Sequence, residues 1–493
     1  MEPTRDTGVP PAPGDDWRQL RDAVQHVLEV IARTREHAEE RPVLTSEEWL
    51  REQAVHPGPL PEGATELTAA LREVEERITA GCCNFAHPRY FGYVSPRPLL
   101  QPLLGDLLGS GLNQVPGAWR GGAGATVIEA ETLAWLADFV GYPRGVGSLP
   151  GGIFVSGGTL ANASALKLAR DTVLGRHVQT RGLTGLGVQP AFYMSREGHF
   201  SVWRGLDLLG LGRESVRLIE VDGSGRMDPG ALEQRIHEDV AQGFKPVCLV
   251  GMAGTTPTGA VDPLESLAAI AREHQMWFHV DGASGGALGR HPDCAGLFSG
   301  LELADSLTVD PCKWMFQHFG LGALLVRDGR ELYKSFTATG HYWEELGELD
   351  LFQMSPYGTR QWRSLGLWLT LRHLGRTGLQ ALQSRLLEAT RHLAARVRED
   401  ARLELLMEPT LPICCFRLRG PTPEARNALN TAVQRAVTAE GHSYITLMDW
   451  RGELYLRVAI SNYVTEPRHV DEMLAAVLRH AGTRQPGADV VRP

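Results

Sequence analysis

Two segments of the chain carry residue types that suit chemistry on an organic cofactor. An apolar run ends in an acid within HVDGA, residues 279–283, and DPCKW, residues 310–314, places a lysine further on. A carboxylate can pair with a pyridine nitrogen, a small residue lets a flat ring lie on the backbone, and a lysine amine can condense with an aldehyde. These residues predict a pyridoxal phosphate site, and therefore carbanion chemistry on an amino acid.

Asp281 and Lys313 would have distinct roles in such a site. Paired with the ring nitrogen, Asp281 would keep the ring protonated, so that the ring could accept electrons when a bond at the substrate α-carbon breaks. The alternative is a buried aspartate that caps a helix. Lys313 would be the Schiff-base residue, and its alternative is a solvated surface lysine. Its neighbours Trp314, Met315 and Phe316 indicate an enclosed position.

A glycine-rich loop between a strand and a helix offers a phosphate site. The strand-like residues 152–155 lead into Ser156-Gly157-Gly158-Thr159, and a helical run follows from Leu160 to Ala169. Backbone N–H groups and the positive end of the helix dipole would face a phosphate there. An ordinary capped strand-to-helix connection has the same pattern, so the prediction depends on the other motifs.

Two further turns could contribute to the same site. His199 follows another apolar run after a short loop, where an imidazole could stack on a cofactor ring and exchange a proton. A surface or helix-capping histidine is the alternative. The turn GTTPTG, residues 254–259, follows the run that ends at Val250, and a threonine hydroxyl there could bond the ring oxygen. By itself it is an ordinary turn.

Alternating strand-like and helical runs from Gly151 onward predict an α/β fold with a mostly parallel sheet covered by helices. Helical spacing from Trp17 to Ile78 predicts a helical arm. Runs at residues 413–418 and 454–460 predict strands of a smaller α+β unit. We expect a tail (1–15), the N-terminal arm (16–95), a large domain that binds the cofactor (96–375), a small C-terminal α+β domain (376–482) and a second tail (483–493).

The composition of the 493 residues favours a small-molecule partner. They are 43% hydrophobic and 22% charged, with a net charge of -9 and a pI near 6.0, and nucleic acids or anionic membranes would require a basic surface. No run reaches the ~18 apolar residues of a membrane span. The seven cysteines fit neither a disulfide framework nor a metal site. We expect a cytoplasmic protein without a metal.

In these motifs the chain resembles the group II pyridoxal phosphate-dependent decarboxylases, the family of aromatic-L-amino-acid decarboxylase, within the fold-type I (aspartate aminotransferase-like) superfamily. The resemblance runs from HPRYF, residues 87–91, to Leu478. It implies that Lys313 forms the Schiff base with pyridoxal 5'-phosphate and that Asp281 pairs with the ring nitrogen. Ala283 would lie against one ring face, and His199 would stack on the other.

The same resemblance assigns the remaining contacts and a catalytic loop. Thr256 would contact the ring oxygen, and the phosphate would be held by Gly157, Gly158 and Thr159 with Asp310. The segment from Thr337 to Ser355 resembles the family's mobile loop, in which Tyr342 aligns with the tyrosine that protonates the substrate carbon after CO2 leaves. A plain exposed connection is the alternative. An aldehyde-forming branch of the family replaces this tyrosine with phenylalanine, so Tyr342 and His199 together favour an amine product.

Several positions depart from the family pattern. Cys312 stands where the family has histidine before the lysine, which leaves altered chemistry open. The aromatic substrate pocket is expected around residues 115–120, yet Gly117 is small and Arg120 is cationic, so a larger or anionic substrate could fit. Thr359 occupies a position that varies with substrate in related enzymes. The candidate substrate-pocket residues are therefore Ser95, Val115, Gly117, Arg120 and Thr359.

The leading hypothesis is decarboxylation of an aromatic or modified, bulky L-amino acid to a primary amine and CO2. A second hypothesis is decarboxylation coupled to oxidative deamination, which yields an aldehyde and consumes oxygen, and Cys312 keeps it open. A third is a non-catalytic relative that acts as a binding protein. The family resemblance and the helical arm together predict a homodimer with the site at the subunit interface, and no nucleic-acid or membrane partner.

Overall fold

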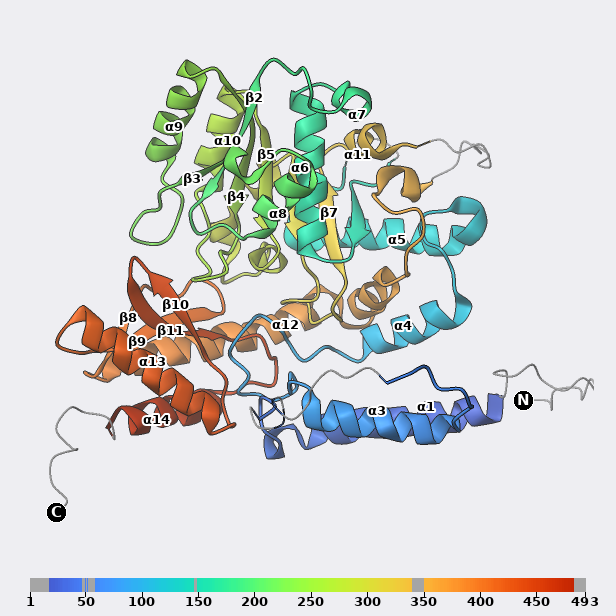
Figure 1. Cartoon of the computed structure of the whole chain (residues 1–493), viewed down its shortest axis with the longest axis vertical. Coiled ribbons are helices and arrows are strands. Elements are labelled where there is room, and N and C mark those ends of the chain that lie inside the picture. The colour runs from blue at the N-terminus through green and yellow to red at the C-terminus, as the bar shows by residue number, and fades with distance from the viewer. Residues whose placement is uncertain are drawn as a thin grey trace, which may run out of the picture.

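A computed structural model describes residues 17–46, 49, 51, 58–145, 149–338 and 350–482 of the chain. A seven-stranded sheet lies at the centre of its larger part, in the order β1-β7-β6-β5-β4-β2-β3 (Figure 1). The bounds of its strands are β1 Gly152–Val155, β2 Gln189–Ser195, β3 Val216–Ile219, β4 Phe244–Met252, β5 Trp277–Gly282, β6 Ser306–Val309 and β7 Gly322–Val326.

β7 lies between β1 on one side and the five strands β6, β5, β4, β2 and β3 on the other. β7 pairs antiparallel with β1 and with β6, whereas the neighbours from β6 to β3 all pair in parallel. The mostly parallel sheet expected from the alternating pattern is confirmed. Because the parallel strands share one direction, the carboxyl ends of β2, β4, β5 and β6 meet at one edge, where ligands of open α/β sheets bind.

Both faces of the sheet are covered by packed side chains. Phe154 belongs to one buried cluster, while its neighbours Ile153 and Val155 belong to another. Successive side chains of a strand point to opposite faces, so the two clusters lie on the two sides of the sheet. This explains why continuous apolar runs, rather than alternating ones, mark these strands in the sequence.

Helices of the connecting segments surround the sheet (Figure 1). Their bounds are α4 Gln101–Leu112, α5 Trp119–Val140, α6 Gly158–Val173, α7 Val178–Arg181, α8 Ser201–Leu208, α9 Pro229–Ala241, α10 Leu264–Glu273 and α11 Gly329–Phe336. Short 3₁₀ turns lie at Ala38–Glu40, Arg213–Ser215, Gly285–Leu288, Ala295–Phe298, Leu301–Leu303 and Leu351–Met354. None of the helices in the described part of the chain is long and apolar enough to cross a membrane.

A second, antiparallel sheet forms the C-terminal part, in the order β10-β11-β9-β8. Its strands are β8 Leu403–Leu405, β9 Ile413–Leu418, β10 Thr446–Trp450 and β11 Glu453–Ala459, with helices α13 Pro423–Ala439 and α14 Pro467–Gly482. The long helix α12, Ser364–Glu399, joins the two parts and is interrupted at Gly375, whose φ of 64° is a conformation that favours glycine.

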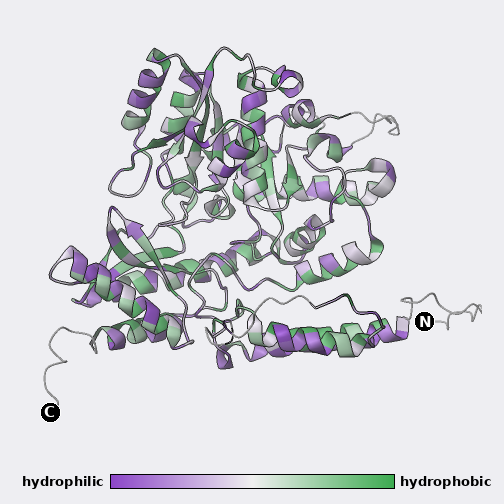
Figure 2. Cartoon of the chain, in the orientation of Figure 1, coloured by the Kyte–Doolittle hydropathy of each residue, from purple (hydrophilic) through white to green (hydrophobic). Residues whose placement is uncertain are grey.

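The N-terminal helices α1, Trp17–Glu36, and α3, Leu67–Gly81, lie side by side along the body of the molecule (Figure 1). Apolar residues recur along both helices and along α4 in Figure 2. Large apolar side chains that are exposed there are Trp17, Leu20, Val27, Leu28, Leu67, Val74, Ile78, Leu104, Leu107, Leu108 and Leu112. Such a concentration is typical of a surface that another chain covers.

Candidate active site

The two residues that define the predicted site lie at the same edge of the large sheet. Asp281 is near the carboxyl end of β5, and Lys313 lies in the turn that follows β6. They line one cavity of about 190 Å³. The cavity is lined by Gly158, Thr159, Asn162, His199, Ser201, Met252, Gly254, Thr256, Asp281, Ala283, Ser284, Asp310 and Lys313. Every predicted cofactor contact is in this set except Gly157, which precedes it in the chain.

Helix α6 begins two residues earlier than the helical pattern suggests. The Gly157 carbonyl accepts hydrogen bonds from the N–H groups of Leu160 and Ala161, so Gly158 and Thr159 form the first helical turn rather than a loop. Gly157 has a φ of 139°, which a residue with a side chain rarely adopts. The glycine therefore aims the start of the helix, where backbone N–H groups have no partner within the helix, into the cavity.

The start of α6 has space for a phosphate. A Cβ atom at Gly158 would lie 3.2 Å from the Ala283 Cβ and 3.5 Å from Oδ2 of Asp310. Without that atom, the helix start, the Ala283 methyl and the lysine turn enclose an open volume rather than a packed one. A planar ring over Ala283 with its phosphate at the helix N-terminus fits this arrangement.

Asp281 is buried and presents a hydrogen-bonded carboxylate. The side chain is 3% exposed. Oδ2 accepts a hydrogen bond of 2.7 Å from Nδ2 of Asn162, and Oδ1 accepts one of 3.1 Å from the Ala283 N–H. Two donors stabilise the ionised form of a carboxylate. This is the state required to pair with a protonated ring nitrogen.

His199 lies at the start of α8 beside the cavity. Its Nδ1 is 2.8 Å from the Ser201 hydroxyl oxygen and 3.3 Å from the Ser201 backbone nitrogen. Burial is the main cause that lowers the pKa of His199, and the charged groups near it are Asp281, Lys313, Arg204 and Asp310. The imidazole is therefore neutral at physiological pH, which suits a ring that stacks on a cofactor.

The Lys313 amine points into the cavity from an enclosed turn. Nζ donates a hydrogen bond of 3.1 Å to the Ser284 hydroxyl. The next three residues, Trp314, Met315 and Phe316, are all fully buried, as their apolar character predicts. Phe316 has a φ of 57°, a strained conformation for a bulky residue, and such strain concentrates at functional sites.

Asp310 brings a second buried acid to the cavity, close to the helix start. The Cys312 thiol donates to Oδ1 of Asp310 over 2.9 Å, and the Gly158 N–H also donates to this carboxyl group. Burial is the largest cause that raises the pKa of Asp310. Burial also raises the pKa of the Cys312 thiol, which stays protonated.

Comparison with known proteins identifies what this geometry belongs to. Residues 50–419 match the model of the pyridoxal-dependent decarboxylase conserved domain. The chain belongs to this family. It is accordingly an enzyme of the pyridoxal phosphate-dependent amino acid decarboxylase class, and pyridoxal 5'-phosphate is its cofactor. The resemblance and the cofactor inferred from the motifs are thereby confirmed.

Similar proteins span most of this decarboxylase. An aromatic-L-amino-acid decarboxylase of Bacillus atrophaeus is 28% identical over 428 residues, which cover 85% of this chain and 86% of that protein. A phenylacetaldehyde synthase of a Rosa hybrid cultivar is also 28% identical, over 94% of each chain. The crystal structure of Catharanthus roseus tryptophan decarboxylase in complex with L-tryptophan is 25% identical with a TM-score of 0.87, and covers 96% of this chain and all of that one. The fold-type I architecture is confirmed.

The predicted substrate-pocket residues lie outside the 190 Å³ cavity of the decarboxylase. Val115 and Thr359 line another cavity, of about 540 Å³, and Thr359 also borders one of about 220 Å³. Ser95 bonds Tyr90, the Gly117 N–H donates to the Thr126 hydroxyl, and Arg120 is exposed. The structure does not bring these five residues together in one cavity.

The predicted catalytic tyrosine cannot be placed. Tyr342 lies outside the described residues, within the gap at 339–349, so its role stays a prediction. The ends of the proposed loop are described. Ala338 donates its N–H to the Gln353 side chain, and the backbone N–H of Phe352 donates to the Gly117 carbonyl.

Among the cavity residues that were not found from the sequence, three form hydrogen bonds with predicted site residues. Asn162, Ser201 and Ser284 bond Asp281, His199 and Lys313, respectively. One signal was present for Asn162, because it lies four residues after Gly158 and therefore on the same helix face. Ser201 and Ser284 follow predicted site residues closely, but a serine in such a turn is common.

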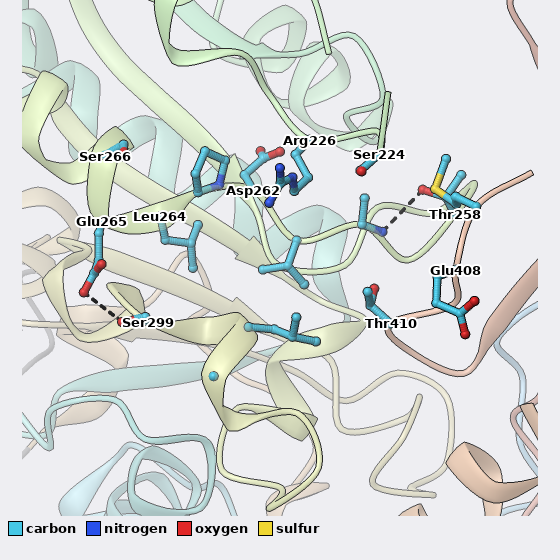
Figure 3. A pocket seen from close by; sticks show the side chains of 16 residues that line it. Ser224, Arg226, Thr258, Asp262, Leu264, Glu265, Ser266, Ser299, Glu408 and Thr410 are labelled. Carbon is cyan, nitrogen blue, oxygen red and sulfur yellow. Dashed lines mark hydrogen bonds between the residues drawn. The ribbon is translucent and has the colours of Figure 1, made fainter. Parts of the chain in front are cut away.

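A larger cavity of about 440 Å³ lies elsewhere in the decarboxylase (Figure 3). It contains Asp262, whose two carboxylate oxygens accept hydrogen bonds from the backbone N–H groups of Met227 and Met252. No lysine, histidine or cysteine is among the described residues that line it. Both oxygens of its one fully buried acid, Asp262, are thus bonded to the backbone. The smaller cavity is therefore the candidate active site.

Proposed function

We propose that this decarboxylase converts an aromatic or modified, bulky L-amino acid to the primary amine and CO2. The observation that carries the proposal is one cavity that contains Lys313, Asp281 and His199 at the carboxyl edge of a parallel sheet. When bound there, pyridoxal phosphate supplies the electron sink for the bond between the α-carbon and the carboxylate.

The residues of the cavity would divide the work. Lys313 would anchor the cofactor covalently and release it to the substrate amine, after which its Nζ is free to move protons. The Asp281 carboxylate would hold a proton at the ring nitrogen, and His199 would cover the ring and exclude water. Rate and specificity then depend on a substrate carboxylate held perpendicular to the ring, where the breaking bond overlaps the conjugated system.

The amine product is the finer part of the proposal. It is supported by His199 in the cavity and by the alignment of Tyr342 with the family's proton donor. Cys312, which replaces the family histidine, and the similarity to a phenylacetaldehyde synthase keep the oxidative product as the second candidate. That product requires oxygen as a co-reactant, so oxygen uptake separates the two.

The substrate would enter from the side where Val115 and Thr359 line the 540 Å³ cavity. The Gly117 backbone accepts a hydrogen bond from Phe352, so this segment is held against the end of the proposed loop. Gly117, Arg120 and Ser95 stay candidate pocket residues. We expect that Thr359→Gly changes the ratio of kcat/KM between substrates, while the absorbance of the bound cofactor is unchanged.

We also propose a homodimer. The exposed apolar side chains of α1, α3 and α4 would be covered by the second copy, and α4 leads directly to the segment that carries Val115 and Gly117. Dimer formation would therefore complete the pocket. Analytical ultracentrifugation of the purified protein tests this, and a monomer at micromolar concentration would contradict it. The cytoplasmic location stays a prediction.

The function is tested with purified protein loaded with pyridoxal phosphate and a panel of L-amino acids. Mass spectrometry follows CO2, amine and aldehyde, and an electrode follows oxygen. CO2 with the matching amine and no oxygen uptake supports the proposal. CO2 with aldehyde and oxygen uptake favours the second candidate, and neither product from any amino acid in the panel contradicts both.

A further inference from the structure

A directed chain of hydrogen bonds runs along one face of β5, where Trp277, His279 and Asp281 are alternate residues, to the site. It begins at the indole of Trp277, whose Nε1 donates to the Ser306 hydroxyl oxygen over 2.8 Å. An indole N–H can only donate, so one lone pair of the serine oxygen is occupied. The serine's own hydrogen can go to His279 Nδ1, which is 2.9 Å from the hydroxyl oxygen, whereas the Ser306 carbonyl oxygen, 3.2 Å from the same nitrogen, could only accept.

The next hydrogen bond of the chain joins His279 to Asn162. Burial lowers the pKa of His279 to about 4, so the ring is neutral and carries one hydrogen. With Nδ1 as acceptor, that hydrogen is on Nε2, which lies 3.1 Å from Oδ1 of Asn162. The Thr308 hydroxyl donates to the same oxygen over 2.6 Å.

Asn162 then has only one amide orientation. Its oxygen receives two donors, and its nitrogen faces two acceptors, Oδ2 of Asp281 at 2.7 Å and the Ser201 hydroxyl oxygen at 2.8 Å. The side chain is 1% exposed and uses all four of its hydrogen-bonding positions. A flipped amide would place Oδ1 against the Asp281 carboxylate, an arrangement that requires a protonated Asp281.

The same direction reaches His199. Because Ser201 accepts from Asn162, its hydroxyl hydrogen is free for His199 Nδ1, 2.8 Å away, and the Ser201 backbone N–H points to the same nitrogen. Two donors at Nδ1 leave the single hydrogen of the neutral ring on Nε2. The groups on the two sides of the cavity are thus coupled through one side chain.

We propose that Asn162 is a positioning residue that, oriented by Trp277, Ser306 and His279, holds Asp281 as an ionised hydrogen-bond acceptor and His199 as the neutral tautomer with hydrogen on Nε2. Asn162 thereby sets both the charge that pairs with the cofactor ring nitrogen and the donor that the stacked histidine offers to substrate. This inference depends on the cofactor and on no particular substrate or product.

The first experiment separates this role from a merely structural one by cofactor affinity. Apoenzyme of wild type and of Asn162→Ala is titrated with pyridoxal 5'-phosphate and with the analogue in which carbon replaces the ring nitrogen. The substitution is expected to weaken binding of pyridoxal phosphate about tenfold or more and to change binding of the analogue less than about twofold, because only the former has a nitrogen for Asp281. Equal weakening of both ligands, or of neither, overturns the proposal.

A matched control lies on the same helix. Ser164 is buried on α6 two residues from Asn162, and its hydroxyl has no hydrogen-bond partner among the described residues. Ser164→Ala is expected to leave both affinities unchanged.

The Ser306→Ala substitution tests the chain at a residue outside the cavity. Without its hydroxyl, His279 can place its hydrogen on Nδ1 and bond the carbonyl of residue 306, so the amide loses its orientation and the selective loss of affinity should recur. An unchanged affinity in Ser306→Ala overturns the upstream part of the chain, even where Asn162→Ala does not fold.

The second experiment reads His199 directly. Histidine labelled with 15N in the full-length protein shows from its nitrogen chemical shifts which ring nitrogen carries hydrogen, and His199→Gln identifies the signal. We expect the Nε2–H tautomer in wild type and a mixture of tautomers in Ser201→Ala and Asn162→Ala. A mixture in wild type, or the same tautomer in all variants, overturns the assignment. Neither readout requires turnover, so failure of the proposed reaction would not affect it.

Discussion

The thiol of Cys312 and the carboxyl group of Asp310 are joined by a hydrogen bond of 2.9 Å in the turn that carries Lys313, the proposed Schiff-base lysine. Both groups are buried, and Asp310 also accepts from the Gly158 N–H at the start of α6. An acid thus occupies part of the helix N-terminus that we expect to receive the cofactor phosphate. Two anions at one helix start repel each other unless the carboxyl group takes up a proton.

This arrangement predicts that cofactor affinity depends on pH through Asp310. Burial raises the pKa of Asp310, and a bound phosphate would raise it further, so affinity should fall as pH rises through that value. Asp310→Asn keeps an acceptor for Gly158 but carries no charge. It should bind pyridoxal phosphate about tenfold more tightly once Asp310 is ionised, which corresponds to about 1.4 kcal/mol, and equally well at low pH. Fluorescence titration of apoenzyme between about pH 5 and pH 9 measures this.

A comparison aspartate is available at the other end of β6. Burial also raises the pKa of Asp305, which accepts a hydrogen bond from the Phe278 N–H. Asp305→Asn should leave the pH dependence of cofactor binding unchanged. If Asp310→Asn instead weakened binding at every pH, the Asp310 charge would favour cofactor binding through its interaction with Lys313. The repulsion argument would then be wrong.

Lys313 should be indispensable for covalent capture of the cofactor. Lys313→Ala removes the amine that reacts with the aldehyde, so the visible absorbance of bound cofactor should shift to that of the free aldehyde. Turnover should fall roughly 10³-fold or more, as when other covalent nucleophiles are removed. Lys334→Ala is the control, because Lys334 pairs with Glu331 on α11 and lies outside the cavity. Retention of the absorbance in Lys313→Ala would assign the covalent bond to another amine.

The central features of the site were predictable because each leaves a local signal. Asp281 ends an apolar run, Lys313 precedes an aromatic cluster, and glycines mark the start of α6. Runs of consecutive β-branched and apolar residues likewise predict the strands, since strands that are buried on both faces of a sheet require such runs. These signals depend on a few neighbouring residues, which is why a single sequence contains them.

The hydrogen bonds around Asn162 were not predictable in the same way. They require β5, β6, α6 and the start of α8 to converge, and residues 39 to 146 positions apart in the chain take part. The start of α6 was misplaced because a helix can begin at a glycine when a carbonyl accepts its first hydrogen bonds. The candidate substrate-pocket residues lie in separate segments of the chain and do not share one cavity, and the proposed second copy would complete such a pocket.

His199 should produce an acid limb in the pH–rate profile that lies below the usual histidine value. Burial lowers its pKa, so the neutral ring persists below about pH 6.5 and is lost only at lower pH. We expect kcat/KM to fall as pH drops through this lowered pKa. The glutamine side chain of His199→Gln has a planar amide that does not titrate. This variant should therefore have a lower kcat/KM at all pH values and lack the acid limb. A limb of unchanged position in His199→Gln would assign the titration to another group.

A buried ion pair beside the cavity lined by Val115 and Thr359 should control stability more than chemistry. Arg360 and Glu129 form a two-pronged pair between α5 and the segment that leads into α12, and Ser364 adds a hydrogen bond of 2.7 Å to the carboxylate. Glu129 is fully buried, so Glu129→Gln leaves the Arg360 charge uncompensated and should cost about 3–5 kcal/mol of unfolding free energy. The exposed pair of Arg144 with Asp138 on the same helix is the control, and Asp138→Asn should cost less than about 1 kcal/mol. Denaturant unfolding of the two variants measures the difference. Equal losses would mean that water or another group compensates Arg360, and the pair would then not be what holds α5 against α12.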